Sequence, residues 1–598
     1  MSESSFSRFI QAHKVAVAVT AVVGAGSVAG LLYYMSQQNA GLDDSESLKP
    51  KKKSKATKKK KKSEKSGTVV HANWPSSDIP IDSTTGLPNV TEELVTKMTK
   101  QQQSEWALAL KETGNQYYKA EDFKPAIQCY TLALLCKADP VFYANRAAAY
   151  AAQGEHQKCI DDCTEALKLN PSYPKCLLRR AHAYENIEKY EEAIYDLTAL
   201  TIYGGLNDQS PESILERNLK KLANKINEEQ YSTLPKELPS SSSISSFFGA
   251  FAKENVDTDE SKYEDQSCSQ FLAKALTEIA KDTYEDYVKA DVLIHQAIAS
   301  YEKDPPKADS KHAGLAYEYQ GTFDFLKGES ESAVSNLNKA LQLNPRGRTH
   351  VLLGLVNADK GDFLSADQAF AQAIKLNPED PDIYYHYGQL YYLMGDLEKA
   401  KENFEKSKLY NPDNVFGYIQ LACIAYKNGD TNSCDEQFKD AKKRFPTSSE
   451  VPNYYGEILF DRQDYGGAAK QFEISARLQE SLPTFNIGAL PLINKSAICQ
   501  VNKDIVGCEE ILKKACELDP KSEVARINLG QIYLQQQKVQ DAIALFKDAC
   551  RLSRSNDDRV QAISLMEASK IQLKIKQDPV LSKKVHEIME RAGLERGL

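Results

Sequence analysis

Five polar side chains in the first third of the chain have the types and spacing needed to bind a carboxylate. Lys111 and Asn115 are four residues apart, as are Lys175 and Arg179, and Asn145 lies between the two pairs. Residues four apart share one helix face, so each pair should point into the same groove. Ammonium, guanidinium and amide groups form strong charge-assisted hydrogen bonds to carboxylates. The pattern therefore predicts a groove for an extended peptide with a free C-terminal carboxylate and acidic side chains.

Each of the five residues taken alone has a simpler explanation, because Lys and Arg commonly keep a helix face soluble. The five occur at fixed offsets within a repeated pattern, however, and no acidic residue occupies any of the positions. This regularity favours a binding site over a solvated surface.

A second candidate groove lies in the C-terminal half of the chain, at the corresponding positions of later repeats. It carries aromatic, apolar and polar residues: Tyr385, Gln389, Tyr392, Ile419, Cys423, Tyr426, Asn453, Glu457 and Phe460. Such a mixture suits a segment that is partly hydrophobic and partly basic. The alternative for any single tyrosine is packing between helices.

Neither metal binding nor a common catalytic motif is indicated. The twelve cysteines include no Cys-x-x-Cys pair, and none of the nine histidines lies three to five residues from another, as a zinc finger requires. Cys159, Cys434 and Cys508 fall where the repeats need a small buried residue. The chain has no Gly-x-x-x-x-Gly-Lys loop and no Gly-x-Ser-x-Gly turn. We therefore expect a binding protein with no cofactor and no enzyme activity.

The elements that position these side chains repeat every 33–34 residues and match the tetratricopeptide (TPR) signature of small, aromatic and proline residues. Small residues let paired helices approach, and aromatic residues fill the gaps. Ten copies begin near Ala107, Pro140, Pro174, Gly314, Gly347, Pro381, Val415, Ser449, Ala489 and Glu523. A degenerate eleventh copy is expected over about 271–304. The predicted fold class is all-α, a TPR α-solenoid superhelix in two blocks with one N-terminal transmembrane helix.

An uncharged stretch near the N-terminus predicts the membrane anchor. Val15 to Met35 contains 21 residues without a charge, close to the ~20 that a spanning helix needs. The stretch is longer than the apolar region of a cleaved signal peptide, which is the main alternative. Eleven lysines follow between Lys49 and Lys65, and the positive-inside bias then keeps the large C-terminal part in the cytosol.

The lysine tract also argues against nucleic acid as a partner. The whole chain has a formal net charge of −8, while the tract alone carries +10. The rest of the protein is therefore acidic, whereas a nucleic-acid binder would spread basic charge over its folded surface.

The expected organisation follows from these signals. It comprises a short N-terminal tail at 1–14, a transmembrane anchor at 15–35, a basic disordered linker at 36–92, an N-terminal TPR block of three repeats and a capping helix at 93–230, a Ser-rich linker at 231–262, and a C-terminal TPR block of about eight repeats with capping helices at 263–598. Within the Ser-rich linker, Ser245-Ser-Phe-Phe-Gly-Ala-Phe251 is an apolar cluster that either docks on a block or belongs to a loop.

Three stretches carry a resemblance to a known binding site. Leu110-Lys-Glu-Thr-Gly-Asn115, Tyr143-Ala-Asn-Arg146 and Lys175-Cys-Leu-Leu-Arg-Arg-Ala181 resemble the dicarboxylate clamp of TPR co-chaperones. The resemblance implies that the five polar residues hold the C-terminal Glu-Glu-Val-Asp tails of the 70- and 90-kDa heat-shock chaperones.

The order of segments over nearly the whole chain resembles the 70-kDa preprotein import receptors of the mitochondrial outer-membrane translocase. Supporting stretches are Asp139-Pro-Val-Phe-Tyr143, Ser245-Ser-Phe-Phe-Gly249 and Val451-Pro-Asn-Tyr-Tyr-Gly-Glu-Ile-Leu459. The resemblance implies a single-pass outer-membrane receptor that docks chaperones, receives hydrophobic carrier-type precursors and passes them to a pore with other translocase subunits. It leaves homodimerisation open.

Two other functions compete with this interpretation. A membrane-anchored TPR co-chaperone scaffold at the endoplasmic reticulum would share the clamp but lack a precursor groove. An enzyme with accessory repeats, such as a phosphatase or prolyl isomerase, would need a catalytic domain. Repeats and linker occupy nearly every residue from 107 to 556, so that second alternative has no room in the chain.

Overall fold

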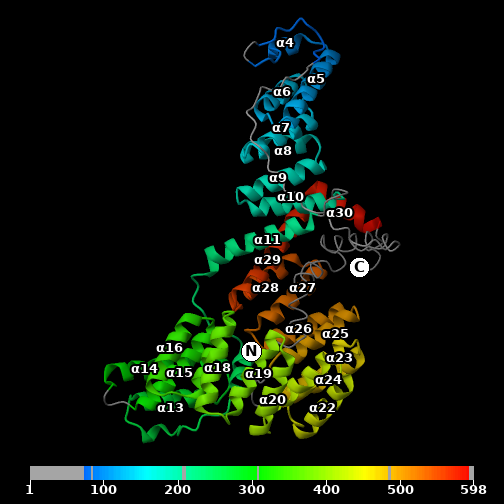
Figure 1. Ribbon diagram of the computed structural model, residues 1–598. Coiled ribbons are helices and arrows are strands. Elements are labelled where there is room, and N and C mark those ends of the chain that lie inside the picture. Colours follow the sequence, from blue (N-terminus) through cyan, green and yellow to red (C-terminus); the bar gives the residue numbers. More distant parts are fainter. Residues whose placement is uncertain (1–72, 83–84, 205–210, 306–308, 482–486, 592–598) are drawn as a thin grey trace. The chain divides into compact units, whose positions relative to one another are not determined.

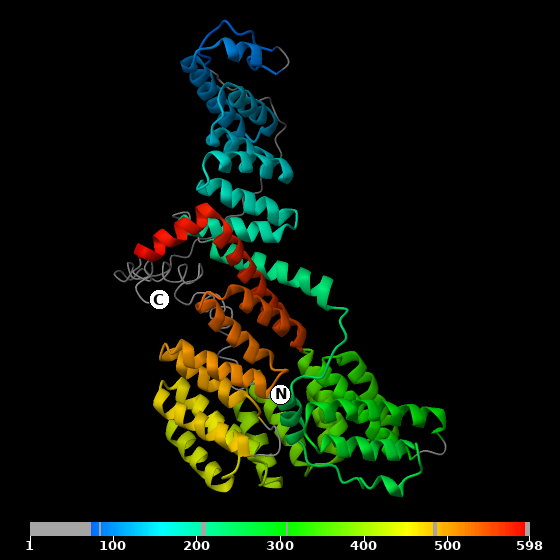
Figure 2. The same ribbon diagram turned by 180° about the vertical axis from the view of Figure 1, so that it is seen from behind.

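The computed structural model describes residues 73–82, 85–204, 211–305, 309–481 and 487–591 (Figures 1 and 2). These residues form helices, apart from loops and one isolated antiparallel bridge between Ile81 and Pro88. The chain divides into two compact units. We call the described residues within 73–226 and 567–591 the N-terminal unit, and those within Asn227–Met566 the central unit.

The N-terminal unit contains the three predicted repeats as three helix pairs. After the short helix α4 (Glu92–Lys97), the pairs are α5 (Lys100–Lys119) with α6 (Phe123–Cys136), α7 (Pro140–Ala152) with α8 (His156–Leu169), and α9 (Pro174–Asn186) with α10 (Tyr190–Ile202). Helix α11 (Glu212–Ile226) packs on α10, as expected for a capping helix. Each pair also packs on the next, so the stack shares a continuous core.

The central unit contains eight further pairs, including the degenerate repeat. They are α13 (Cys268–Ile279) with α14 (Tyr284–Lys303), α15 (Ser310–Lys327) with α16 (Ser330–Leu343), α17 (Gly347–Asp359) with α18 (Phe363–Leu376), α19 (Pro381–Met394) with α20 (Leu397–Tyr410), α21 (Val415–Lys427) with α22 (Thr431–Arg444), α23 (Glu450–Asp461) with α24 (Tyr465–Ser481), α25 (Leu490–Val501) with α26 (Ile505–Leu518), and α27 (Glu523–Gln535) with α28 (Val539–Leu552). The stacked pairs are visible in both orientations (Figures 1 and 2).

A small residue facing an aromatic ring lets the two helices of a pair approach closely. A Cβ atom added to Gly354 would lie 2.7 Å from the Phe370 ring, and one added to Gly388 would lie 2.8 Å from Phe404. Both rings are fully buried. The small and aromatic residues of the sequence pattern are therefore in direct contact within each of these helix pairs.

The Ser-rich segment differs from the expected linker. It contains helix α12 (Ser241–Gly249), between the short π-helical turn η1 (Asn227–Tyr231) and the 3-10 turn η2 (Glu260–Lys262). Ile244 and Phe247 are buried in the core of the central unit. The apolar cluster therefore docks on a repeat block, because its side chains find aromatic partners there.

The last two helices of the chain divide between the two units. Helices α29 (Asn556–Gln577) and α30 (Pro579–Arg591) follow the last repeat, and the described residues from 567 onward belong to the N-terminal unit. Helix α30 packs on α10, and Ile571, Ile575 and Leu581 are buried in the same cluster as Leu200 and Ile202. The Tyr195 hydroxyl donates a hydrogen bond of 2.8 Å to Asp578. The apolar face left open by the third repeat explains this placement.

The predicted anchor at 15–35 lies outside the described residues, as do the tail at 1–14 and most of the linker at 36–92. In the part of the chain that the structure describes, no helix is both long and apolar enough to cross a membrane.

The close contact between Gly354 and Phe370 can be tested by overpacking. We expect Gly354→Ala to lower the free energy of unfolding by about 1–3 kcal/mol, because the added methyl group forces the buried ring to move. Urea unfolding measures the change. The exposed Gln372→Ala substitution in α18 is the control, and Phe370→Leu in the Gly354→Ala background should restore part of the loss. Equal stability of Gly354→Ala and Gln372→Ala would disprove the packing argument.

Candidate peptide-binding site

The five predicted clamp residues lie on the first helices of three successive pairs. Lys111 and Asn115 belong to α5, Asn145 to α7, and Lys175 and Arg179 to α9. All of them are at least partly accessible, and Lys175 is exposed. The structure thus places the five side chains on consecutive helices of one unit.

One hydrogen bond joins the first two of these helices at the clamp positions. The side-chain oxygen of Asn115 accepts from the Asn145 amide at 3.2 Å and from the Tyr130 hydroxyl at 2.8 Å. The Lys111 ammonium lies 3.7 Å from Glu112. The two asparagines are therefore in direct contact, which fixes the orientation of both amides.

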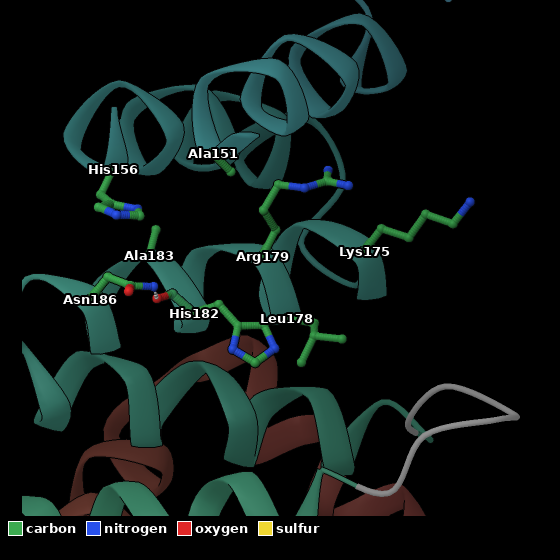
Figure 3. A pocket seen from close by; sticks show the side chains of 8 residues that line it. All are labelled: Ala151, His156, Lys175, Leu178, Arg179, His182, Ala183 and Asn186. Carbon is green, nitrogen blue, oxygen red and sulfur yellow. Dashed lines mark hydrogen bonds between the residues drawn. The ribbon is translucent and has the colours of Figure 1, made fainter. Parts of the chain in front are cut away.

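A cleft of about 410 Å³ adjoins the third helix. In Figure 3, Lys175 and Arg179 extend toward the same side, while His156 and Asn186 lie at the opposite end. The Arg179 guanidinium also donates to the Ala144 carbonyl at 2.7 Å, which ties it to α7. The cleft is lined by Ala151, His156, Lys175, Leu178, Arg179, His182, Ala183 and Asn186.

The lining of this cleft agrees only in part with the predicted set. Lys175 and Arg179 line it, whereas Lys111, Asn115 and Asn145 lie on the preceding helices and are not among its lining residues. Sequence reasoning missed His182 and Asn186. Both follow Arg179 at the i+3 and i+7 positions of the same helix, so the helical spacing that linked Lys175 to Arg179 could have found them.

Two buried ion pairs hold the helices that carry the clamp residues. Arg146, next to Asn145, binds Asp162 through two hydrogen bonds of 2.8 and 2.7 Å. Arg180, next to Arg179, binds Asp196 through two bonds of 2.7 Å. Each guanidinium therefore ties the first helix of its pair to the second.

A threonine from the preceding pair completes each of these ion pairs. Thr131 accepts from Arg146, and Thr164 accepts from Arg180, both at 3.0 Å. Burial raises the pKa of the Asp196 carboxyl above its ordinary value, and the facing Arg180 guanidinium offsets only part of this rise. A carboxylate that is only 1% exposed needs such a bidentate partner to stay charged. The ion pairs thus fix the rotation of α7 and α9.

One acidic residue beside the cleft is neutralised by cations of α11. Glu185 accepts hydrogen bonds from Arg217 at 2.8 and 2.7 Å and from Lys221 at 2.9 Å. These contacts lower the pKa of Glu185 to about 2. The Glu185 charge is therefore compensated, and Lys175 and Arg179 keep the neighbouring cleft positive.

The second predicted groove maps onto the first helices of three later pairs. Its residues lie on α19, α21 and α23 of the central unit. Tyr385, Tyr392, Ile419, Cys423, Asn453 and Glu457 are buried, whereas Gln389, Tyr426 and Phe460 are partly exposed. These residues therefore share a common side of the stack, and their role in binding stays a prediction.

Polar contacts connect several of these residues inside the central unit. Glu457 accepts hydrogen bonds of 2.9 Å from the amides of Asn453 and Asn494. The Gln389 amide donates to the Tyr385 hydroxyl at 2.7 Å. The interior of this unit is thus polar at the positions where the sequence predicted a mixed surface.

No group of three or more metal-ligating side chains occurs within the described ranges. Helix pairs stacked in this way, with polar groups aligned along their first helices, define an all-helical TPR solenoid. Models of the tetratricopeptide repeat match residues 140–173, 358–421 and 509–557.

Comparison with curated proteins gives a more specific result. The chain is 35% identical to the mitochondrial import receptor subunit TOM70 of Saccharomyces cerevisiae, over 86% of this chain and 88% of the relative. It is 27% identical to the human TOM70 subunit, over 78% of this chain and 80% of the relative. The crystal structure of yeast Tom70 matches with a TM-score of 0.55 and 36% identity, over 81% of this chain and 99% of that chain. The chain belongs to the TOM70 family of mitochondrial import receptor subunits.

The repeated ion pair beside Arg179 can be tested by removing one partner and then both. We expect Arg180→Ala to destabilise the N-terminal unit by about 3–5 kcal/mol, because Asp196 would be left charged and buried without a partner. The double variant Arg180→Met/Asp196→Leu should recover most of the loss, since no unpaired charge remains. Urea unfolding measures both. A double variant as unstable as Arg180→Ala would contradict this explanation.

Proposed function

We propose that this import receptor resides in the mitochondrial outer membrane and docks cytosolic chaperones by their acidic C-terminal tails. The clamp residues Lys111, Asn115, Asn145, Lys175 and Arg179 form the docking site. The observation that carries the proposal is the contact in which the Asn145 amide donates to the Asn115 oxygen, which brings the amide side chains of two repeats to one point. A single surface lysine could not create such a convergence.

The arrangement suits the chemistry of a Glu-Glu-Val-Asp tail. A C-terminal aspartate carries two carboxylates, one on the main chain and one on the side chain. Lys111 and the asparagine pair supply one set of donors, and Lys175 with Arg179 supplies another. The apolar side chains of Ala151, Leu178 and Ala183 in the cleft suit the valine.

The central unit is proposed to receive the precursor. The groove residues on α19, α21 and α23 combine aromatic rings with Glu457, which suits hydrophobic, partly basic segments of carrier-type precursors. The receptor hands these precursors to other translocase subunits and performs no catalysis. The segment 15–35 anchors it, with the large C-terminal part in the cytosol. Membership of the TOM70 family favours this location over the endoplasmic reticulum.

Chaperone docking is tested by titrating a fluorescent Glu-Glu-Val-Asp peptide against the purified protein. We expect Arg179→Ala to weaken binding at least about tenfold, because a charge-assisted hydrogen bond to a charged group contributes about 1.5–3 kcal/mol. Lys124→Ala is the matched control, since this exposed lysine lies on α6, the second helix of its pair. A peptide with an amidated C-terminus should bind weakly to both. Equal affinity of the Arg179→Ala and Lys124→Ala variants would refute the clamp.

Precursor binding is tested by site-specific photo-crosslinking. A photoreactive amino acid at the partly exposed Tyr426 or Phe460 should crosslink to a labelled carrier precursor. The same group at Leu409, which is 74% exposed on the second helix of its pair, should not crosslink. Strong crosslinking from Leu409 with none from Tyr426 and Phe460 would move the precursor site to another face.

A further inference from the structure

Residues 240–254, which we call the strap, place an amphipathic helix against the repeats of the central unit. Ile244, Phe247, Phe248 and Phe251 occur at positions i, i+3, i+4 and i+7, which is the spacing of one helix face. The first three lie within α12, and Phe251 follows its last residue, Gly249, by two positions. Ile244, Phe247 and Phe251 are buried and Phe248 partly buried. The strap thus binds as amphipathic helices bind grooves in other proteins.

Each phenylalanine of the strap contacts an aromatic side chain of the repeats. The Phe247 and Phe325 ring centroids are 5.9 Å apart, and Phe248 stacks on Tyr287 and Tyr319 at 6.1 Å. Tyr287 belongs to α14, whereas Tyr319 and Phe325 belong to α15. An aromatic surface on two neighbouring helices therefore receives the first part of the strap.

The end of the strap lies against α17 and α19. The Phe251 ring packs 4.3 Å from that of His386 on α19, and the Arg348 guanidinium of α17 lies 4.5 Å from its centroid. The next peptide N–H, that of Ala252, donates a 2.7 Å hydrogen bond to Asp382. Aromatic, cationic and backbone contacts thus position this end.

A carboxylate anchors the end of the strap. Glu254 accepts hydrogen bonds from Arg346 at 2.7 Å and from Arg348 at 2.9 Å. Both arginines also face the buried Glu318, at 3.5 and 3.8 Å. The guanidinium groups therefore keep a carboxylate partner in the repeats when Glu254 leaves. The receiving surface needs no charged occupant to remain folded.

The strap can leave without breaking a helix pair. All eight pairs of the central unit pack on each other independently of α12. The chain is not helical between Ser232 and Ser240 or between Ala250 and Asp259. Ala252 and Lys253 are exposed. The strap is therefore a short helix held between two extended connections.

We propose that the aromatic and arginine surface of α14, α15, α17 and α19 is a binding site for amphipathic helices with apolar residues at i, i+3, i+4 and i+7. The strap is its resident occupant, and an incoming helix of that pattern displaces it. Because the strap is tethered, its effective concentration is on the order of millimolar. A competing helix displaces the strap when the ratio of its concentration to its dissociation constant exceeds the ratio of this effective concentration to the dissociation constant of the strap. The site adjoins the groove proposed on α19, α21 and α23, since Ala250 of the strap packs in the same apolar cluster as Tyr385 and Tyr392. Its own contact residues are different, and the proposal does not depend on precursor binding.

The probe that tests the proposal is a fluorescent peptide with the sequence of residues 238–256. It is titrated against the full-length protein and against Phe251→Ala/Glu254→Gln, in which both changes lie in the strap and leave the receiving surface intact. The variant should bind the peptide at least about tenfold more tightly than the wild type, because its own strap competes less. Glu254→Gln alone is the milder second variant. A scrambled peptide is the control ligand.

A disulfide lock, which joins the strap covalently to the repeats, should have the opposite effect on peptide binding from the weakening variants. The Ser245 hydroxyl donates to Asp282 at 2.9 Å, so Ser245→Cys/Asp282→Cys places two thiols between the strap and the loop before α14. Mass spectrometry establishes that the disulfide has formed before the titration. Peptide binding should disappear in the oxidised protein and return on reduction. Each variant with only one of the two added cysteines should bind the peptide at least as tightly as the wild type, because it lacks the Ser245–Asp282 hydrogen bond and forms no crosslink.

Two results would overturn the proposal. One is equal peptide affinity of the wild type and both weakened variants, when circular dichroism and tail-peptide binding show them to be folded. The other is undiminished peptide binding by the oxidised lock. Either result would make α12 a permanent part of the core. Neither would affect the clamp, whose ligand is the acidic tail and whose residues lie in the N-terminal unit.

Discussion

The close approach of the two helices in each pair is the constraint on which the rest of the structure depends. In the first repeat, a Cβ atom on Gly114 would lie 2.7 Å from the Tyr130 ring. The same tyrosine donates its hydroxyl hydrogen bond to Asn115, the next residue after that glycine. One contact therefore both packs the pair and orients a clamp side chain. Repeat packing and the orientation of a predicted clamp residue are coupled at this point, because the ring cannot move without releasing the amide.

Stacking of the helix pairs brings the predicted clamp residues of three successive repeats onto neighbouring helices. Arg146 and Arg180 are 34 positions apart, and each follows a clamp residue and binds a buried aspartate of its own pair. The ion pairs hold the first helices in register, so Asn145 and Arg179 project from equivalent positions. A buried pair of this kind adds little net stability. The ion pair instead fixes the rotation of the two helices, since rotating either helix would separate the guanidinium from its carboxylate.

Local periodicity explains what the sequence could predict. The eleven helix pairs of the described residues occur where the pattern of small and aromatic residues predicts them. The five clamp residues lie on the first helices of three consecutive pairs. Both predictions require only the spacing of residues within a repeat. The docking of Phe247 was one of two alternatives left open by the sequence, and the placement of Leu581 on the third repeat was not predicted. These contacts join segments that are far apart in the sequence. The fixed spacing of the repeats therefore gives no information about them. For Tyr385 and Glu457, periodicity predicted the helix side but not the degree of burial.

The two segments outside the repeats show different ways of covering an apolar face. Helix α30 and the end of α29 bury aliphatic residues, among them Ile575 and Leu581, in a continuous core. A tetratricopeptide stack needs such a cap to avoid exposing its last apolar face. The strap instead packs on helices of the central unit, α14, α15, α17 and α19, whose pairs already bury their apolar faces against one another. It is held by aromatic contacts and by polar ones, such as Glu254 with Arg346. A cap of the first kind is required for solubility, whereas a cover of the second kind can be exchanged for another helix of the same pattern.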